Sequence, residues 1–214
     1  MRYYYYVENN KELVDELVKE KWLKTPDIVA AFKAVHRDDF VPENIKNKAF
    51  LNTALSLGWG QTISQPLVVA FMMELLAPQK NSKILEIGFG SGWQTCLLAH
   101  IVTQGSGRVF AVELVQELCT FGIKNISKYG FLKKGTVRCF CQNAGNGLEE
   151  NAPYDRIIAA ASAKNNIPGA WREQLNKGGR IVAPVDNSIW LFIKKSDDEW
   201  EEKEFPGFVF VPLV

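Results

Sequence analysis

The chain has 214 residues, 47% of them hydrophobic, and a formal net charge of +1 at pH 7. This composition is typical of a globular protein of one or two domains, and its scattered basic residues argue against nucleic acid or an anionic membrane as partners, since these favour a basic face. No run of about 18 apolar residues exists, so no membrane-spanning helix is expected.

The N-terminal part is predicted to be helical. Four tyrosines stand within residues 1–6, for which a small packed cluster is the default expectation, and this start is unlike a secretory signal, so we expect a cytoplasmic protein. Apolar residues at helical spacing predict a first helix around 13–18 that ends near Thr25-Pro26, and a second helix over 27–36.

From residue 83 onward, buried strands alternate with helices. The predicted strands are 83–87, 108–114, 136–141, 154–161 and 180–185, and the predicted helices are 93–102, 115–129 and 168–175. This alternation predicts an α/β fold with a parallel, doubly wound sheet. Residues 188–194 and 207–212 are expected to add a final antiparallel pair, because the link between them holds no convincing helix. The whole chain, 1–214, is interpreted as one domain.

The four cysteines lie at positions 96, 119, 139 and 141, and no two of them form a CxxC pair. Reduced core thiols of a cytosolic protein are the favoured interpretation over a disulfide or a metal site. With only His36 and His100 in the chain, a His-rich metal site is not available either, so no metal is expected.

The most informative segment is residues 86–92, which read EIGFGSG between a strand and a helix. Glycines suit this place because the chain turns sharply and a ligand must approach bare backbone, although a tight turn without a ligand would use them too. Trp93 stands where the dinucleotide fingerprint GxGxxG needs its third glycine, which disfavours a nicotinamide cofactor, and no P-loop motif is present.

Two polar residues lie at or just beyond the ends of neighbouring strands. Glu113 ends the second strand, 21 residues beyond Gly92, where an acid accepts hydrogen bonds from ribose hydroxyls at the edge of a doubly wound sheet. Asn143 follows the third strand, and its amide could accept from an adenine amino group. A charged residue at a strand end is often only solvated, but together with the glycine loop this spacing predicts a nucleoside-binding crevice.

Three segments resemble one family, the protein-L-isoaspartate (D-aspartate) O-methyltransferases. They are GQTISQP at 60–66, preceded by FVP at 40–42; ILEIGFGSGWQTCLLA at 84–99; and APYD at 152–155 running through to GGRIV at 178–182. The closing FVPL at 210–213 is similar to the family's end as well. GQTISQP is the most specific piece, because general methyltransferases do not carry it.

The resemblance implies a Rossmann-like class I methyltransferase fold, S-adenosylmethionine as methyl donor with S-adenosylhomocysteine as product, and isoaspartyl residues of damaged proteins or peptides as substrates. Residues 1–65 would then form a helical extension and substrate loop, and 66–214 the cofactor-binding core. We also expect a monomer. Ser64 is expected at the acceptor site, with Thr62, Ile63 and Gln65 binding substrate beside it. Cofactor binding is expected from Gln61, Glu86, Gly88, Gly90, Gly92, Glu113, Leu114, Asn143 and Ala144.

The chain departs from the family pattern in two places. Residues 142–144 read Gln-Asn-Ala where the family usually has Gly-Asp-Gly, and weaker cofactor binding is the most that this implies. Residues 50–52 read Phe-Leu-Asn where the family tends to show Tyr-x-Asp, which concerns the acceptor side and the choice of substrate.

The expected chemistry needs position rather than a general base. Methyl transfer from a sulfonium is an in-line displacement, and an acceptor carboxylate with a pKa of about 4 is already ionised at pH 7. Our hypothesis is that the Ser64 hydroxyl and nearby backbone N–H groups hold one carboxylate oxygen, with Thr62 and Gln65 shaping the loop. The alternative for Ser64 is a cap on the helix that begins at Pro66.

Other functions fit less well. The small residues at 160–163 lack the Asn/Asp-Pro-Pro-aromatic motif typical of base methyltransferases, which argues against DNA or RNA adenine methylation. A methyltransferase for another peptide carboxylate, motivated by residues 50–52, and an inactive cofactor-binding interaction module, motivated by Asn143, stay open as alternatives. A nicotinamide oxidoreductase is a remote one.

Overall fold

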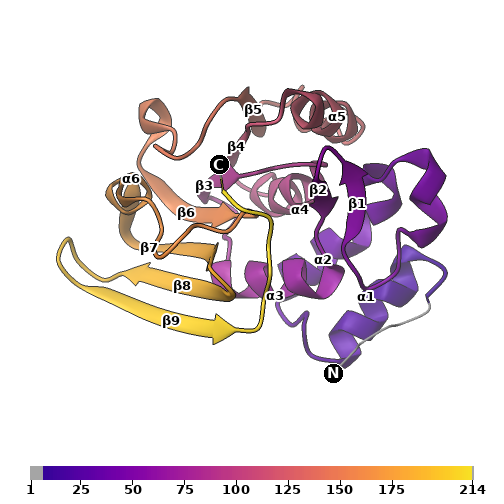
Figure 1. The fold of residues 1–214 in the computed structure, drawn as a ribbon, viewed down its shortest axis with the longest axis horizontal. Coiled ribbons are helices and arrows are strands. Elements are labelled where there is room, and N and C mark those ends of the chain that lie inside the picture. The colour runs from indigo at the N-terminus through magenta and orange to yellow at the C-terminus, as the bar shows by residue number, and fades with distance from the viewer. Residues whose placement is uncertain (1–6, 214) are drawn as a thin grey trace.

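A computed structural model describes residues 7–213, and the tyrosine cluster expected in residues 1–6 lies outside them. The strands form a seven-stranded sheet and a separate two-stranded hairpin, and helices flank the larger sheet (Figure 1). The elements in chain order are α1 (Asn10–Lys19), α2 (Pro26–Ala34), η1 (Arg37–Phe40), η2 (Glu43–Lys48), β1 (Leu55–Gly58), β2 (Gln61–Ile63), α3 (Pro66–Leu76), β3 (Lys83–Ile87), α4 (Trp93–Val102), β4 (Arg108–Glu113), α5 (Gln116–Ser127), β5 (Val137–Cys141), η3 (Glu149–Asn151), β6 (Tyr154–Ala159), α6 (Gly169–Glu173), β7 (Leu175–Val185), β8 (Ser188–Lys194) and β9 (Trp200–Pro206).

The strand order is β5-β4-β3-β6-β7-β8-β9. The five strands β5, β4, β3, β6 and β7 are parallel to one another, whereas β8 pairs antiparallel with β7, and β9 pairs antiparallel with β8. The predicted α/β sheet, mostly parallel with an antiparallel C-terminal pair, is therefore confirmed. Because the chain passes from β3 out to β4 and β5 and then returns to β6, the order reverses beside β3, where such sheets bind ligands beyond their carboxyl ends.

Successive residues of the central strands face two different cores. Ile84 packs in the larger core with side chains of α1 to α5, whereas Leu85 faces a smaller core around Trp171 of α6. Leu13 of α1 and Phe32 of α2 are buried in that same larger core, and α2 contacts α4 directly. The N-terminal helices thus pack against the sheet's own helix layer. A functional division of the chain near residue 65 stays a prediction.

The C-terminal end of the chain differs from the expectation. The last strand is β9, Trp200–Pro206, and the predicted strand at 207–212 is wrong. An edge strand tolerates alternating charged side chains, so the sequence WEEKEF serves as one although it reads as a polar link. At Gly207, which has a φ of 96°, the chain leaves the sheet, and it runs back across the ends of the strands (Figure 1). Main-chain hydrogen bonds of Ser162 with Val211 and Leu213 hold this last segment of the described chain in place.

The hairpin β1–β2 was not expected from the sequence. Its turn, Gly58-Trp59-Gly60, has positive φ angles of 96°, 53° and 71°. Two glycines make such a turn possible, but strands of four and three residues are too short to show an alternation. Strand β2 carries the QTI of GQTISQP, and the hairpin thereby holds the predicted acceptor loop at a fixed place.

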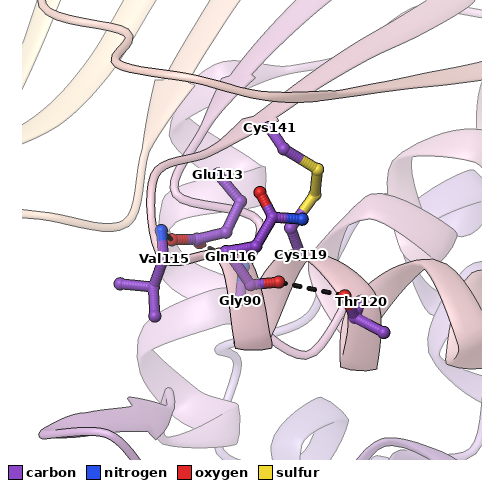
Figure 2. The surroundings of a disulfide bond; sticks show 7 residues. All are labelled: Gly90, Glu113, Val115, Gln116, Cys119, Thr120 and Cys141. Atoms are coloured by element: carbon purple, nitrogen blue, oxygen red, sulfur yellow. Dashed lines mark hydrogen bonds between the residues drawn. A yellow bond between two sulfur atoms is a disulfide. The ribbon is translucent and has the colours of Figure 1, made fainter.

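The expectation that the cysteines are reduced core thiols is wrong for two of them, because Cys119 and Cys141 form a disulfide (Figure 2). Cys119 lies on α5 and Cys141 at the end of β5, with a Cα–Cα distance of 5.9 Å. The two positions are 22 residues apart on different element types, so no spacing rule reveals the pair. Cys96 and Cys139 are free thiols, and burial raises the pKa of Cys139 to about 12.

The disulfide predicts a redox-dependent stability. A bond closing a loop of this length contributes about 3 kcal/mol, so reduction should lower the melting temperature by roughly 10 °C. Thermal denaturation with and without dithiothreitol measures this, and the double variant C119S/C141S is the control, in which the reductant should have no effect. A thiol titration of the unfolded, unreduced protein that finds four free thiols instead of two would contradict the bond.

Within residues 7–213, no helix has the length and apolarity needed to cross a membrane. The same part of the chain contains no group of three or more His, Cys, Asp or Glu side chains arranged to bind a metal ion.

Candidate active site

A cavity of about 470 Å³ lies beyond the carboxyl ends of the parallel strands. This size suits a cofactor together with part of a substrate. Of the predicted site residues, the cavity is lined by Gln61, Thr62, Ser64, Gln65, Gly88, Gly90, Glu113, Leu114 and Ala144. A smaller cavity of about 40 Å³ adjoins the same loops and adds Ile63 and Glu86. Gly92 and Asn143 line neither of them.

The glycine loop after β3 is fixed by the neighbouring strand. The N–H groups of Gly88 and Phe89 donate to the Val112 carbonyl at 2.8 and 3.2 Å. Gly90 has a φ of 51° and no atom within 4 Å of the place a Cβ would take, so its backbone is open to a ligand. At Gly92, glycine is needed for packing: a Cβ there would lie 2.6 Å from Ile126, so the glycine permits close packing of α4 on α5.

Glu113 joins the glycine loop to the start of α5. Its carboxylate accepts hydrogen bonds from the N–H groups of Gly90 and Val115, both at 2.9 Å (Figure 2). Its own carbonyl accepts from the N–H of Gln142 at 2.9 Å. A carboxylate oxygen has two acceptor sites, so each oxygen can still receive one hydroxyl. Glu113 is therefore oriented by the main chain and ready to accept from a ribose.

The loop after β5 is held from behind by the smaller core. Trp171 donates its ring N–H to the Ala144 carbonyl at 2.9 Å, and Gln174 binds the N–H of Leu148 and the carbonyl of Asn146. The Asn143 side-chain oxygen accepts from the N–H of Gly145 at 2.7 Å, which turns the side chain back on its own loop. Ala144 thus faces the cavity, while contact between Asn143 and an adenine stays a prediction.

Glu86 is fully buried next to the smaller cavity. One carboxylate oxygen accepts from Gln94 at 3.2 Å, and the other, Oε2, has no hydrogen-bond partner. Burial raises the pKa of Glu86 from its ordinary 4.5 to about 7, although the neighbouring Thr95 and Gln94 side chains oppose this. A buried acceptor without a partner is costly unless a ligand supplies a donor. An ammonium group is the donor that suits this carboxylate best.

Asn52, and not Ser64, caps the helix that follows the acceptor loop. Its side-chain oxygen accepts from the N–H of Leu67 at 3.0 Å, and its carbonyl accepts from the Gln65 side chain at 3.0 Å. The N-cap position of α3 is Gln65, which makes no side-chain cap bond. The capping alternative for Ser64 is therefore wrong. Ser64 lines the cavity, and its hydroxyl has no protein partner within residues 7–213, so it can bind a ligand.

One wall of the larger cavity is not predicted from the sequence. The segment 207–213 lines the larger cavity throughout, as do Val115 and Leu118 near the start of α5. The only signal for the segment was the similarity of residues 210–213 to the family's end. Its contacts with Ser162 and Asn187 join parts of the chain that no local pattern connects.

The residues present fit S-adenosylmethionine. Of the described residues that line the larger cavity, Glu113 alone has an ionisable side chain, so none of them places a cation against a positively charged sulfonium. The open backbone at Gly90, the oriented Glu113 carboxylate and the unpartnered Glu86 oxygen match a methionine chain, a ribose and an amino group, respectively.

Comparisons with known proteins agree with this geometry. The family model for protein-L-isoaspartate(D-aspartate) O-methyltransferases matches residues 8–214. The chain is 36% identical over 208 residues to the protein-L-isoaspartate O-methyltransferase of Methanopyrus kandleri, which covers 95% of this chain and 90% of the relative. It is 37% identical over 210 residues to that of Aliivibrio salmonicida, which covers 97% of each. A Plasmodium falciparum chain assigned to the same activity and crystallised with S-adenosyl-L-homocysteine has the same fold, with a TM-score of 0.87, 22% identity, and coverage of 97% of this chain and 99% of that one. The chain belongs to the protein-L-isoaspartate(D-aspartate) O-methyltransferase family.

Proposed function

We propose that this enzyme transfers the methyl group of S-adenosylmethionine to the free carboxylate of isoaspartyl residues in damaged proteins or peptides. The observation that carries the proposal is that the acceptor loop and the cofactor loop meet in one place. Thr62 and Ser64 line both cavities, and so do Gly88 and Gly90. An acceptor held by the Ser64 loop therefore lies next to a cofactor held by the glycine loop.

When bound, S-adenosylmethionine supplies an activated methyl carbon on a sulfonium sulfur. The protein's own part is to bind, orient and exclude water. Glu113 would accept the ribose hydroxyls, and Glu86 would pair with the amino group. Ser64 would donate its hydroxyl to one oxygen of the acceptor carboxylate, which leaves the other oxygen free to attack. The apolar segment 208–213 would shield this reaction from solvent.

The departure at Asn52 supports the same substrate rather than another one. Asn52 is 2% exposed and lines neither cavity, because it caps α3 behind the acceptor loop. The change from the family's usual aspartate thus concerns how the loop is supported, not what the cavity contacts. A cytoplasmic location and a monomeric state stay predictions.

A radiolabelled-methyl assay tests the proposal directly. With S-adenosylmethionine present, a synthetic isoaspartyl peptide should become a methyl ester, whereas the matched peptide with an ordinary aspartate should stay unlabelled, because its carboxylate is displaced from the position that the loop prepares. Equal labelling of both peptides would favour another peptide carboxylate as substrate. Cofactor binding by calorimetry without any ester would favour an inactive interaction module.

A further inference from the structure

Arg37 is a buried cation that the proposed mechanism does not use. It stands on η1, and its side chain has no exposed surface. No carboxylate within residues 7–213 lies at ion-pair distance from it, so only dipoles and one aromatic ring, that of Trp93 at 5.4 Å, compensate its charge. Burial lowers the pKa of Arg37 to about 9, which still leaves it charged at pH 7. A buried charge of this kind is costly and calls for a specific role.

The guanidinium donates hydrogen bonds to five main-chain carbonyl groups. Nη1 donates to Ala49 at 2.6 Å and to Leu51 at 3.3 Å. Nη2 donates to Thr53 at 3.0 Å, to Ser64 at 3.0 Å and, more weakly, to Ile63 at 3.4 Å. The arginine thus joins the stretch before the hairpin to the acceptor loop after it. Only a planar fork with several donors can span both segments at once.

These bonds also set the direction of the loop's amides. In a trans peptide unit, the N–H points away from the C=O. Because the Ile63 and Ser64 carbonyls face Arg37, the N–H groups of Ser64 and Gln65 face the opposite side. Neither N–H has an acceptor within the described residues, and both Ser64 and Gln65 line the larger cavity. Among residues 7–213, no lysine or arginine lines that cavity to receive a substrate carboxylate.

We propose that Arg37 is a positioning residue for the acceptor: it turns the Ser64 and Gln65 amides toward the cavity, where they receive the substrate carboxylate together with the Ser64 hydroxyl. Its charge polarises the two peptide units, so their N–H groups become better donors to an anion. This inference rests on the proposed acceptor site at Ser64. It adds the reason why a site without a basic lining binds an anion.

The test compares R37K and R37Q with the wild type. Lysine keeps the charge but loses the fork, and glutamine loses both. Activity is expressed per cofactor site, counted by calorimetry with S-adenosylhomocysteine, so unfolded protein does not contribute. For R37K we expect kcat/KM for the isoaspartyl peptide to fall by about 10-fold to 100-fold, mainly through a higher peptide KM, while the cofactor Kd stays within about threefold. R37Q should lose at least as much, and if it does not fold, R37K still decides.

The matched control is R180K. Arg180 also donates to a main-chain carbonyl, that of Leu75 at 2.8 Å, but it does so at the end of α3, away from both cavities. This variant should keep its peptide KM. The proposal is overturned if R37K keeps the wild-type peptide KM and kcat, or if its cofactor affinity falls as much as its peptide affinity. If Ser64→Ala is unaffected as well, the acceptor site itself is misplaced; if Ser64→Ala is impaired and R37K is not, only the role of Arg37 fails.

Discussion

Replacing Ser64 with alanine should lower the turnover of an isoaspartyl peptide by about 100-fold and leave the cofactor Kd within about threefold. Ser64 lines both cavities, and its hydroxyl has no protein partner in the described chain and does not cap α3, so the loss of the hydroxyl should leave the fold intact. What is lost is a donor that orients the carboxylate. Single-turnover methyl transfer together with calorimetric titration of S-adenosylhomocysteine separates the two effects.

Ser56→Ala is the control for this variant. Ser56 is an exposed serine on β1 of the same hairpin, and it lines neither cavity. Its variant should behave as the wild type in both measurements. If Ser64→Ala weakens cofactor binding as strongly as turnover, the serine acts on the whole site and not on the acceptor.

The core of this fold could be predicted because its signals are local. The strands β3 and β8 and the helix α4 have the predicted bounds, since each is a run of apolar residues flanked by turn residues. Gly90 and Glu113 could be predicted as a pair because the spacing between the glycine loop and the second strand end is fixed by one βαβ unit. The structure brings them within 2.9 Å of each other.

The rest depends on contacts between distant residues, which leave no local pattern. The edge strand β9 is recognisable only beside β8, and the segment 207–213 becomes part of the site only because Gly207 turns it back across the sheet. The role of Asn52 as a cap for α3 spans 15 residues. Arg37 reaches carbonyls 26 and 27 residues away, and a single arginine in a helical stretch gives no sign of that.

Lowering the pH from 8 to 6 should raise the Kd of the cofactor about tenfold, because Glu86 must be ionised to pair with an ammonium group. In the free protein its pKa is about 7, so most Glu86 is charged at pH 8 and little of it at pH 6. Binding should release a proton in this range. Calorimetry with S-adenosylhomocysteine in buffers of different ionisation enthalpy measures both the Kd and the proton release.

Glu86→Gln should remove that pH dependence and bind the cofactor about 10-fold to 100-fold more weakly at pH 8, where the wild type has its full charge. Glu117→Gln, an exposed acid in the first turn of α5, is the control and should retain the wild-type slope. A slope that persists in Glu86→Gln would assign the titration to another group.

The same carboxylate should make the cofactor-free enzyme less stable as the pH rises. The folded protein holds the Glu86 proton up to a pH of about 7, whereas the unfolded chain releases it near 4.5, so the folded state binds more protons between these values. The stability that Glu86 contributes is therefore complete below pH 4.5 and is lost as the pH rises through 7.

Glu86→Gln should melt at a higher temperature than the wild type at pH 8 without cofactor, and saturating cofactor should reduce or reverse that difference. An equal melting temperature for the two free proteins at pH 8 would mean that the unpartnered oxygen costs nothing, and the case for a ligand ammonium at this carboxylate would lose its physical basis.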